Sequence, residues 1–316
     1  MYRKAHPLFI VCNTPTHVGS GSELGVVDLP IQRERHTGFP KFEASSLKGS
    51  LREAFERSKA DQLTIHRVFG FDADSASSDV IKSIPEKERQ FAGAIGVTDA
   101  RLLLFPVKSM KGVFAWITCL RALKQFQSDM QLCNSEFSIN NLDGDHLKDS
   151  ETYLFATDSN VREGNNILLE EYTFDVSNEL NGVVQIGKTN FPDWLAQHLF
   201  GDDGSYWSEK IKKDIVVLPD NDFKDFVNLS TEVITRTKID NNTGTVAQGA
   251  LFNEEYLPTE SVLYSLALIA PEFKEKDGLK EEEVFDFFKG NLPSPIQIGA
   301  NATLGKGIVT TKLLQL

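Results

Sequence analysis

The chain has 316 residues, of which 41% are hydrophobic and 25% charged, and its net charge is −12. This length and apolar content support one large core or two ordinary ones and exclude an intrinsically disordered chain. No apolar run approaches the ~20 residues of a membrane span, and the N-terminal apolar run is too short for a signal peptide. Cys12, Cys119 and Cys133 share no metal-ligand spacing, which is typical of a reducing compartment. We therefore expect a cytoplasmic protein with no disulfide, no zinc and no membrane partner.

The charge is distributed unevenly along the chain. Residues 31–52 contain five Arg or Lys residues against two Glu, whereas residues 272–289 are dominated by Asp and Glu. A net negative charge therefore does not exclude a nucleic-acid partner, because a local basic groove is sufficient to bind a polyanion.

The first predicted elements are a strand, a loop and a helix. Residues 8–12 form a short apolar run typical of a buried strand, and residues 13–22 are rich in turn formers. Apolar residues at helical spacing predict a helix over 45–57, with Ser45 or Ser46 as its N-cap. Lys48 and Arg52 then lie one turn apart. The helix N-terminus is either an anion site, through free N–H groups and the helix dipole, or an ordinary capped surface helix.

The middle of the chain has a weaker pattern. Short strands are predicted over 95–98, 102–107 and 113–119. Residues of about 121–228 are mixed and polar, and segments such as 72–78 and 201–205 are rich in Asp, Ser and Gly. These features predict exposed loops or insertions and no second independent core.

A hairpin, a strand and a helix follow. Residues 232–239 alternate in polarity, turn residues follow at 240–244, and 245–252 form a second arm, which predicts a projecting hairpin. A near-continuous apolar run over 261–270 predicts a buried strand, and 281–289 predict a helix with an acidic face.

The last feature is a glycine-rich loop over 299–307 before a closing strand over 308–314. Glycine tolerates positive φ and lets backbone N–H groups approach an anion, to which Lys306 adds charge. The spacing matches neither a phosphate-binding P-loop nor a dinucleotide fingerprint. The loop is therefore either a phosphate cradle or a plain hairpin connection.

The order of these elements predicts the fold class. Strand, helix, strands, strand, helix and closing strand indicate an α+β chain with a split β-α-β, ferredoxin-like or RRM-like core and large insertions, in a single domain over 1–316. In that arrangement the loop after the first strand, the start of the 45–57 helix and the glycine loop lie on one side of the sheet.

Several segments together resemble the RAMP superfamily. They are TPTHVGSG at 14–21, VDLPIQR at 27–33, SSLKGSLR at 45–52 and GANATLGKG at 299–307. Within that superfamily the chain is similar to the backbone subunits of type III-B, or Cmr, CRISPR effector complexes. This narrower likeness lies in TDARLLLFPV at 98–107, TGTV at 243–246, GALF at 249–252 and EEYLP at 254–258.

The resemblance implies an antiviral ribonucleoprotein whose copies stack into a filament along a guide CRISPR RNA, together with other effector subunits. It implies that the hairpin over 232–252 is a thumb that interrupts guide–target pairing at a regular interval. Each subunit would act as a nuclease that cuts the target RNA beside that interruption. The guide backbone would be held without base readout. The residues implied in RNA binding are Ser45, Ser46, Lys48, Arg52, Arg33, Arg35, Arg236, Gly299, Asn301 and Lys306.

Asp28 matches the cleavage aspartate of the family. RNA carries its own nucleophile in the 2′-OH, so one carboxylate holding a hydrated divalent ion, for which Mg²⁺ is expected, is sufficient for cleavage. Without the resemblance Asp28 would be an ordinary loop aspartate. His17 is a candidate acid, base or RNA contact, or a structural histidine. Glu255 and Tyr256, with Glu254, either assist a neighbouring site or form a charge pair beside a packed aromatic ring.

Two departures from the family pattern lie at the supposed phosphate sites. Glu43-Ala44 precedes the paired serines, which brings a negative charge close to one site, and Ala300 follows Gly299, which disfavours positive φ at that place. Three functions remain open: a metal-dependent target-cleaving backbone subunit, a structural RNA-binding subunit in which Asp28 is idle, and a guide-processing endoribonuclease of the same superfamily.

Overall fold

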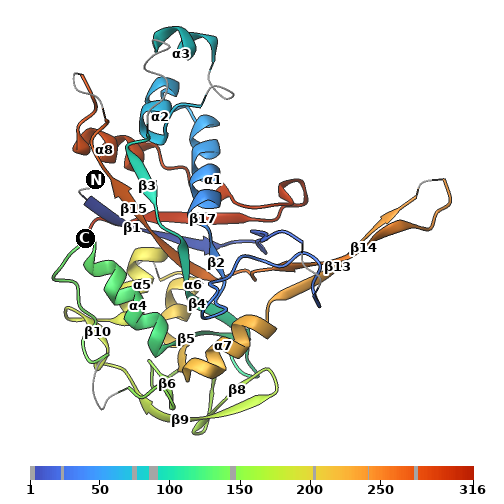
Figure 1. Ribbon diagram of the computed structural model, residues 1–316. Helices are drawn as coiled ribbons and strands as arrows, with labels where there is room; N and C mark the ends of the chain where they lie inside the picture. The colour runs from blue at the N-terminus through green and yellow to red at the C-terminus, as the bar shows by residue number, and fades with distance from the viewer. Residues whose placement is uncertain are drawn as a thin grey trace.

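The computed structural model describes residues 4–22, 25–72, 77–84, 92–142, 147–201, 204–240, 242–273 and 277–316. Its main feature is a 13-stranded sheet with helices on both faces (Figure 1). Among the described helices, none combines the length and the apolar character needed to span a bilayer.

Four long strands form the centre of this sheet. They are β1 (Lys4–Cys12), β4 (Ala100–Lys108), β15 (Val262–Ile269) and β17 (Ile308–Leu313), in the order β17-β1-β15-β4. Each neighbouring pair is antiparallel. The near-continuous apolar sequences of β1, β4 and β15 are typical of strands that are covered on both faces. In β1, Leu8 and Ile10 pack into one hydrophobic cluster, and Phe9 and Val11 pack into the other.

The first face carries four helices, three of which come from near the two ends of the chain. Leu47, Leu51 and Phe55 of α1 and Phe288 of α8 pack into one cluster, with the Phe55 and Phe288 rings stacked 5.5 Å apart. Apolar residues three or four positions apart lie on one side of a helix, so each helix packs one apolar stripe against the sheet. The elements are α1 (Ala44–Glu56), α2 (Gln62–Phe69), α7 (Asp220–Leu229) and α8 (Glu281–Asn291).

The middle of the chain covers the second face. Phe126 of α4 and Trp194 of α5 pack with Phe9 of β1, so this region shares its hydrophobic cluster with the central strands. The prediction for 121–228 was exposed loops or insertions and no second independent core; the region shares a core with the central strands, and it also contains buried helices and strands that the prediction missed. The apolar residues that pack here occur in short groups separated by polar residues, so the sequence shows no clear period. The helices are α4 (Leu120–Gln131), α5 (Phe191–Leu199) and α6 (Tyr206–Lys213).

Strands from the same region extend the sheet beyond β4 in the order β5-β12-β6-β9-β8-β7. They are β5 (Phe114–Cys119), β6 (Thr152–Leu154), β7 (Arg162–Glu163), β8 (Asn166–Leu169), β9 (Tyr172–Glu179) and β12 (Ile215–Leu218). The remaining short elements are β2 (Lys41–Phe42), α3 (Ser78–Ser83), β3 (Ile95–Val97), β10 (Gln185–Ile186), β11 (Thr189–Asn190), β16 (Ile296–Gln297) and the 3₁₀ turn η2 (Ala302–Leu304). Of the predicted loops 72–78 and 201–205, residues 73–76, 202 and 203 lie outside the described part of the chain.

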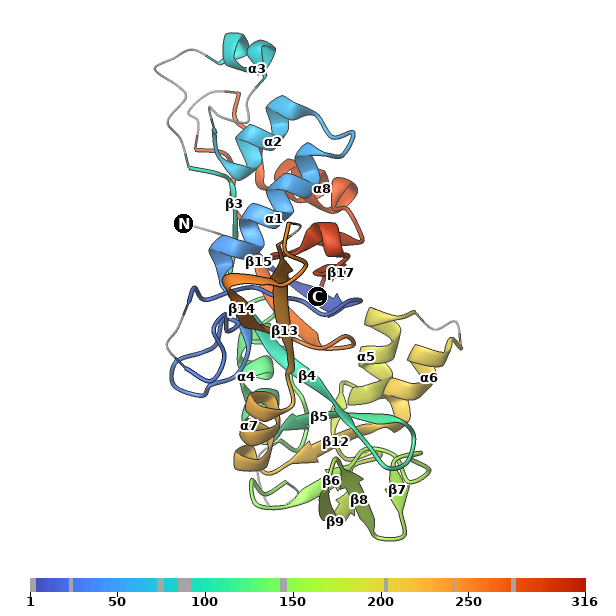
Figure 2. The same ribbon diagram turned by 90° about the vertical axis from the view of Figure 1, so that its right-hand side faces the viewer.

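The hairpin over β13 (Glu232–Ile239) and β14 (Val246–Tyr256) forms its own two-stranded sheet. It projects away from the body of the molecule, on the same side as the loop between β16 and β17 (Figure 1). Viewed from that side, the hairpin base lies between α1 above and α7 below (Figure 2). The predicted strands and helices at 8–12, 45–57, 102–107, 232–252, 261–270 and 281–289 are confirmed, with small shifts of their ends.

Candidate functional site

Asp28 lies in an exposed loop against the base of the hairpin. Its Oδ2 accepts a hydrogen bond from the Asn253 backbone N–H at 2.7 Å, and its side chain is exposed. The next residue pairs with β14 through two backbone bonds, from Leu29 N–H to the Asn253 carbonyl and from Glu255 N–H to the Leu29 carbonyl, each 3.0 Å. The loop therefore presents the carboxylate to solvent at a position fixed by β14.

The side chain of Glu254 is the centre of a buried network. Its Oε2 accepts hydrogen bonds from Arg236 Nε at 2.7 Å and from the Tyr256 hydroxyl at 2.5 Å, and its Oε1 accepts one from Asn301 Nδ2 at 2.6 Å. His17 Nε2 lies 3.8 Å from the same Oε1. Glu254 is 4% exposed and Tyr256 is fully buried. The network joins both strands of the hairpin to the loop after β1 and to the glycine loop.

Burial and hydrogen bonding act in opposite directions on Glu254. Burial alone would raise the pKa of this carboxyl, but hydrogen bonds from Tyr256, Arg236 and Asn301 outweigh it and lower the pKa. Burial, together with the Glu254 carboxylate, raises the pKa of the Tyr256 hydroxyl. The carboxylate stays ionised and the phenol stays protonated at neutral pH, so the donor–acceptor pattern of the network is stable.

Glu255 points to the other side of β14, as alternation along a strand requires. Its carboxylate accepts hydrogen bonds from Arg33 Nη2 at 2.5 Å, the Thr231 hydroxyl at 2.7 Å and the Ile31 backbone N–H at 3.0 Å. It is 5% exposed, and His17, which donates from Nδ1 to the Glu255 carbonyl at 2.6 Å, is 6% exposed. Three of the four residues expected at the cleavage site, namely His17, Glu255 and Tyr256, are thus buried, and only Asp28 is open.

The glycine loop connects β16 to β17 as a hairpin with one 3₁₀ turn. Gly299 has φ +80°, and a Cβ there would overlap the His17 carbonyl, so glycine is required for this close approach. The next positive φ belongs to Asn301, at 64°, and not to Ala300. The departure from the family pattern at Ala300 therefore places no alanine in the left-handed region.

The outer part of this loop offers free donors. Among the described residues, the backbone N–H groups of Asn301, Ala302 and Thr303 have no hydrogen-bond acceptor. The Lys306 ammonium lies 5.1 Å from the Tyr256 ring centroid and forms no ion pair with the described part of the chain. The loop is thus anchored on its inner side and unsatisfied on its outer side, as an anion cradle needs.

The prediction of a serine N-cap on the first helix is wrong. α1 begins at Ala44, its N-cap is Glu43, and Ser45 and Ser46 lie inside the first turn. The helix starts early because Asp99, from the β3–β4 connection, accepts a hydrogen bond from Ala44 N–H at 2.9 Å. No local sequence signal identifies a cap that is 55 residues away.

The same helix start nevertheless has free donors. The backbone N–H groups of Ser45 and Ser46 have no acceptor among the described residues. Burial, with the nearby Arg52, lowers the pKa of Lys48, whose ammonium has no ion-pair partner within the described ranges. Glu43, the second departure from the family pattern, forms an ion pair with Lys41 at 2.6 Å, which offsets its charge.

Gln32, which the sequence did not single out, connects these elements. Its Nε2 donates to the Gly19 carbonyl and to Ser46 Oγ, each at 3.2 Å. On the other side of the loop after β1, Ala300 N–H donates to the His17 carbonyl at 2.9 Å. The start of α1, the loop after β1 and the glycine loop are thus linked through hydrogen bonds, which agrees with the prediction that they lie close together.

The predicted cations differ in their availability. Arg33 Nη1 donates to the Gly38 and Val227 carbonyls, and Arg52 donates to Glu56 and the Gly70 carbonyl. Arg236 is held by Glu254 and Tyr256, as described above. Arg35 is exposed and has no partner within the described ranges. Lys48, Lys306 and Arg35 are therefore the predicted cations left open for a ligand.

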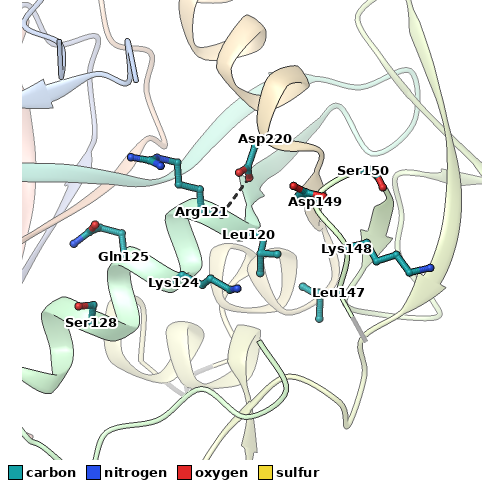
Figure 3. A pocket seen from close by; sticks show the side chains of 10 residues that line it. All are labelled: Leu120, Arg121, Lys124, Gln125, Ser128, Leu147, Lys148, Asp149, Ser150 and Asp220. Carbon is teal, nitrogen blue, oxygen red and sulfur yellow. Dashed lines mark hydrogen bonds between the residues drawn. The ribbon is translucent and has the colours of Figure 1, made fainter. Parts of the chain in front are cut away.

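One hollow of the molecule lies away from these residues. It measures about 640 Å³ and lies at the start of α4, where Arg121 N–H donates to Asp220 Oδ1 at 3.1 Å (Figure 3). Cations and carboxylates are mixed on its wall. None of the predicted site residues lines it. Its lining residues are Leu120, Arg121, Lys124, Gln125, Ser128, Leu147, Lys148, Asp149, Ser150 and Asp220.

Comparisons with known proteins give a consistent result. The RAMP superfamily model matches residues 9–310. The chain is 37% identical over 312 residues to the CRISPR system Cmr endoribonuclease Cmr4 of Pyrococcus furiosus, covering 98% of this chain and 96% of that protein. It is 27% identical over 327 residues to the CRISPR system CMR subunit Cmr4 of Saccharolobus solfataricus, covering 99% and 97%.

Solved structures show the same likeness. The crystal structure of oligomeric Cmr4 from Pyrococcus furiosus superposes with a TM-score of 0.67 at 30% identity, covering 99% of this chain and 98% of that one. A chain of the type III-B Cmr-beta complex bound to cognate target RNA gives a TM-score of 0.69 at 22% identity, over 99% and 98%, which is a likeness of fold.

Proposed function

Because the chain belongs to the RAMP superfamily and, within it, to the Cmr4 subunits of type III-B complexes, we propose that it binds guide RNA and cleaves target RNA paired with that guide. Copies of the chain would stack along the guide, together with other effector subunits. The observation that carries this proposal is the exposed Asp28 carboxylate, fixed on the hairpin base in a chain that also has unsatisfied backbone donors at the start of α1 and in the glycine loop.

The strand order supports the fold expected of such a subunit. In the order β17-β1-β15-β4, α1 lies between β1 and β4 in the chain, and α8 lies between β15 and β17. This is the order that a ferredoxin-like or RRM-like core requires. The projecting hairpin β13–β14 takes the place of the thumb, so interrupted pairing would bring the target backbone to the hairpin base.

The guide would be held by two groups of donors. One is the start of α1, with Ser45 N–H, Ser46 N–H and Lys48, and the other is the outer glycine loop with Lys306. Both present backbone N–H groups and a cation, which suit phosphate oxygens and read no base. Sequence-independent contact is what guide-dependent recognition needs, because base pairing supplies the specificity.

Cleavage would proceed by attack of the target 2′-OH on the adjacent phosphate, with departure of the 5′ oxygen. The chain must hold the 2′-OH in line with the phosphorus and the leaving 5′ oxygen. It must also place a carboxylate beside the cation that neutralises the phosphate. Asp28 suits this role because its Oδ2 is fixed by Asn253 N–H while its exposed carboxylate can still face the strand.

A divalent metal fits at Asp28 only as an ion that the protein holds through this one carboxylate. The described residues hold no cluster of three or more His, Cys, Asp or Glu side chains that could form a metal cage. Mg²⁺ often binds through one or two carboxylates, its own waters and substrate phosphates, which one exposed carboxylate allows. When bound, it would neutralise charge that develops on the phosphate.

The test compares guide-loaded assemblies of the native chain and Asp28→Asn on complementary RNA, with Mg²⁺ and with a chelator. We expect regular cuts that Asp28→Asn reduces by at least about 100-fold, a size typical of losing a group that acts at the reacting atoms. Unchanged cutting in the chelator would reject the metal, and unchanged cutting by Asp28→Asn would reject the assignment of Asp28.

One observation favours a second function, in which the chain only supports RNA. Of the candidate acids and bases at the hairpin base, Glu254, Glu255 and His17 are all buried, and only Asp28 is exposed. If Asp28→Asn assemblies cut at the same positions and rate, the subunit is structural. A specific cut of repeat RNA by the isolated chain would instead favour guide processing.

A further inference from the structure

We propose that Glu254 is a positioning residue that couples the glycine loop to the Asp28 segment, so that the place where the guide is held sets the place where the target is cut. This inference rests on the proposed function. It follows from the fact that one short segment of β14, residues 253–255, carries the contacts of both sites.

The side chain of Glu254 reaches the guide-holding loop. Its Oε1 accepts the Asn301 amide at 2.6 Å, and that amide also donates to the Tyr256 hydroxyl at 3.0 Å. Asn301 stands in the left-handed region directly before the 3₁₀ turn, so its side chain fixes the loop at the point where the free N–H groups begin. The outer loop therefore has one polar anchor on β14.

The backbone on either side of Glu254 reaches Asp28. Asn253 N–H donates to Asp28 Oδ2 at 2.7 Å, and backbone bonds from Asn253 and Glu255 hold Leu29. A shift of Glu254 therefore moves the bonds that place the carboxylate. No loop intervenes between the two sets of contacts, because they belong to consecutive residues of one strand.

The opposite face of the strand resists such a shift. Glu255 is tied to Arg33 and Thr231, and Arg33 continues to the Val227 carbonyl at the end of α7. With both faces of β14 locked, the segment acts as a rigid spacer. Misplacing a reacting group by ~1 Å costs on the order of 100-fold in rate, so loosening this spacer has a kinetic effect without any lost contact to RNA.

The experiment uses guide-loaded assemblies with Glu254→Gln, Asn301→Gly and both changes. Glutamine keeps the size but replaces one of the two carboxylate oxygens with an NH2 group, so it cannot accept both from Arg236 and Tyr256 and from Asn301. Glycine keeps the left-handed backbone of Asn301 and removes only its side chain. The readouts are the single-turnover cutting rate at saturating target, the positions of the cuts and the affinity for guide RNA.

With assemblies saturated with guide RNA, we expect each single variant to slow cutting by about tenfold or more and to spread the cuts to neighbouring nucleotides. We expect the double variant to be no slower than the slower single one, because both changes break one coupling. If Glu254→Gln does not assemble, Tyr256→Phe replaces it, since it removes one hydroxyl of the same network and keeps the ring under Lys306.

Asp129→Asn is the matched control. It perturbs a carboxylate that accepts from the Tyr264 hydroxyl at 2.8 Å on the other face of the sheet, and it should lower thermal stability while cut positions stay the same. The coupling would be overturned if the fold losses in cutting rate of the two single variants multiplied in the double variant. It would also be overturned if the cut positions stayed the same in every variant. If cutting does not depend on Asp28 at all, the proposed function fails, whereas dependence on Asp28 with multiplying rates rejects only the coupling.

Discussion

The start of α1 and the base of the hairpin are both rich in polar residues, but they differ in how fully these residues are hydrogen-bonded or paired with an opposite charge. At the start of α1, Ser45 and Ser46 keep free backbone N–H groups and Lys48 has no carboxylate partner within the described ranges. At the hairpin base, Glu254 and Glu255 accept six hydrogen bonds between them. Unsatisfied donors are suited to hold a ligand, and saturated acceptors are suited to hold a shape.

The pKa shifts express the same contrast. Burial lowers the pKa of Lys48 because no anion compensates its charge, whereas three donors lower the pKa of the buried Glu254. A phosphate at α1 would supply what Lys48 lacks, whereas Glu254 already accepts three hydrogen bonds. The four substitutions or conditions below test this difference in order of expected effect.

Arg33→Met tests the saturated region most severely. It leaves the Glu255 carboxylate, which is 5% exposed, without its cation, and breaking a buried pair typically destabilises by about 3 kcal/mol or more. The free energy of unfolding in urea measures this. Arg35→Met, at an exposed residue without a partner in the described chain, is the control and should change it by less than about 0.5 kcal/mol. Equal effects of the two substitutions would contradict the contrast.

Gly299→Ala tests the link between the two regions. The new Cβ would overlap the His17 carbonyl at φ +80°, whereas Gly305, at φ +70°, has no atom near its Cβ position. We expect Gly305→Ala to cost ~1 kcal/mol for the left-handed conformation alone and Gly299→Ala at least ~2 kcal/mol more. Thermal unfolding of the two variants gives this difference directly. A Gly299→Ala chain as stable as Gly305→Ala would show that the loop can move away from His17.

Lys48→Met tests the unsatisfied region. The lowered pKa means that the folded chain binds this proton less tightly than the unfolded chain, so the charge opposes folding at neutral pH. We expect the free chain to be at least as stable as native, while the salt dependence of guide binding loses a slope of about 0.7. Lys59→Met, at an exposed residue beyond the other end of α1, should leave the slope unchanged. An unaltered slope for Lys48→Met would remove Lys48 from the guide site.

The smallest expected effect is the contribution of Glu254 to the pH dependence of stability, which acid unfolding tests. Its folded pKa lies below the ordinary value of 4.5, so its stabilisation is present above pH 4.5 and disappears as the pH falls through the folded value. The Glu254→Gln chain should therefore lose stability less steeply below pH 4.5 than the native chain. Urea midpoints measured from pH 6 down to pH 3 provide the comparison, and parallel curves would contradict the lowered pKa.

Local patterns were sufficient for the strands and helices whose apolar residues follow one period. β1, α1, β15 and α8 were predicted within a few residues because both sides of each strand and one stripe of each helix are buried. The region 121–228 was not, because β12 pairs with β5 and with β6, which lie far away in the chain, while its local pairs β7–β8, β8–β9 and β10–β11 are short or polar. Likewise, Asp99 caps α1 from 55 residues away, which local pattern cannot predict.

Residue types and local spacing were sufficient to predict the glycine loop and the projecting hairpin, and the resemblance carried by the motifs indicated the family. Only the tertiary structure decided which predicted residues are open. Five residues that were predicted to face a ligand are instead held inside the protein. Partners far away in the chain hold Arg33, His17, Glu255 and Tyr256, and Glu254 holds Arg236 across the same hairpin. Availability depends on long-range pairing of charges and hydrogen-bond donors, which is a property of the fold.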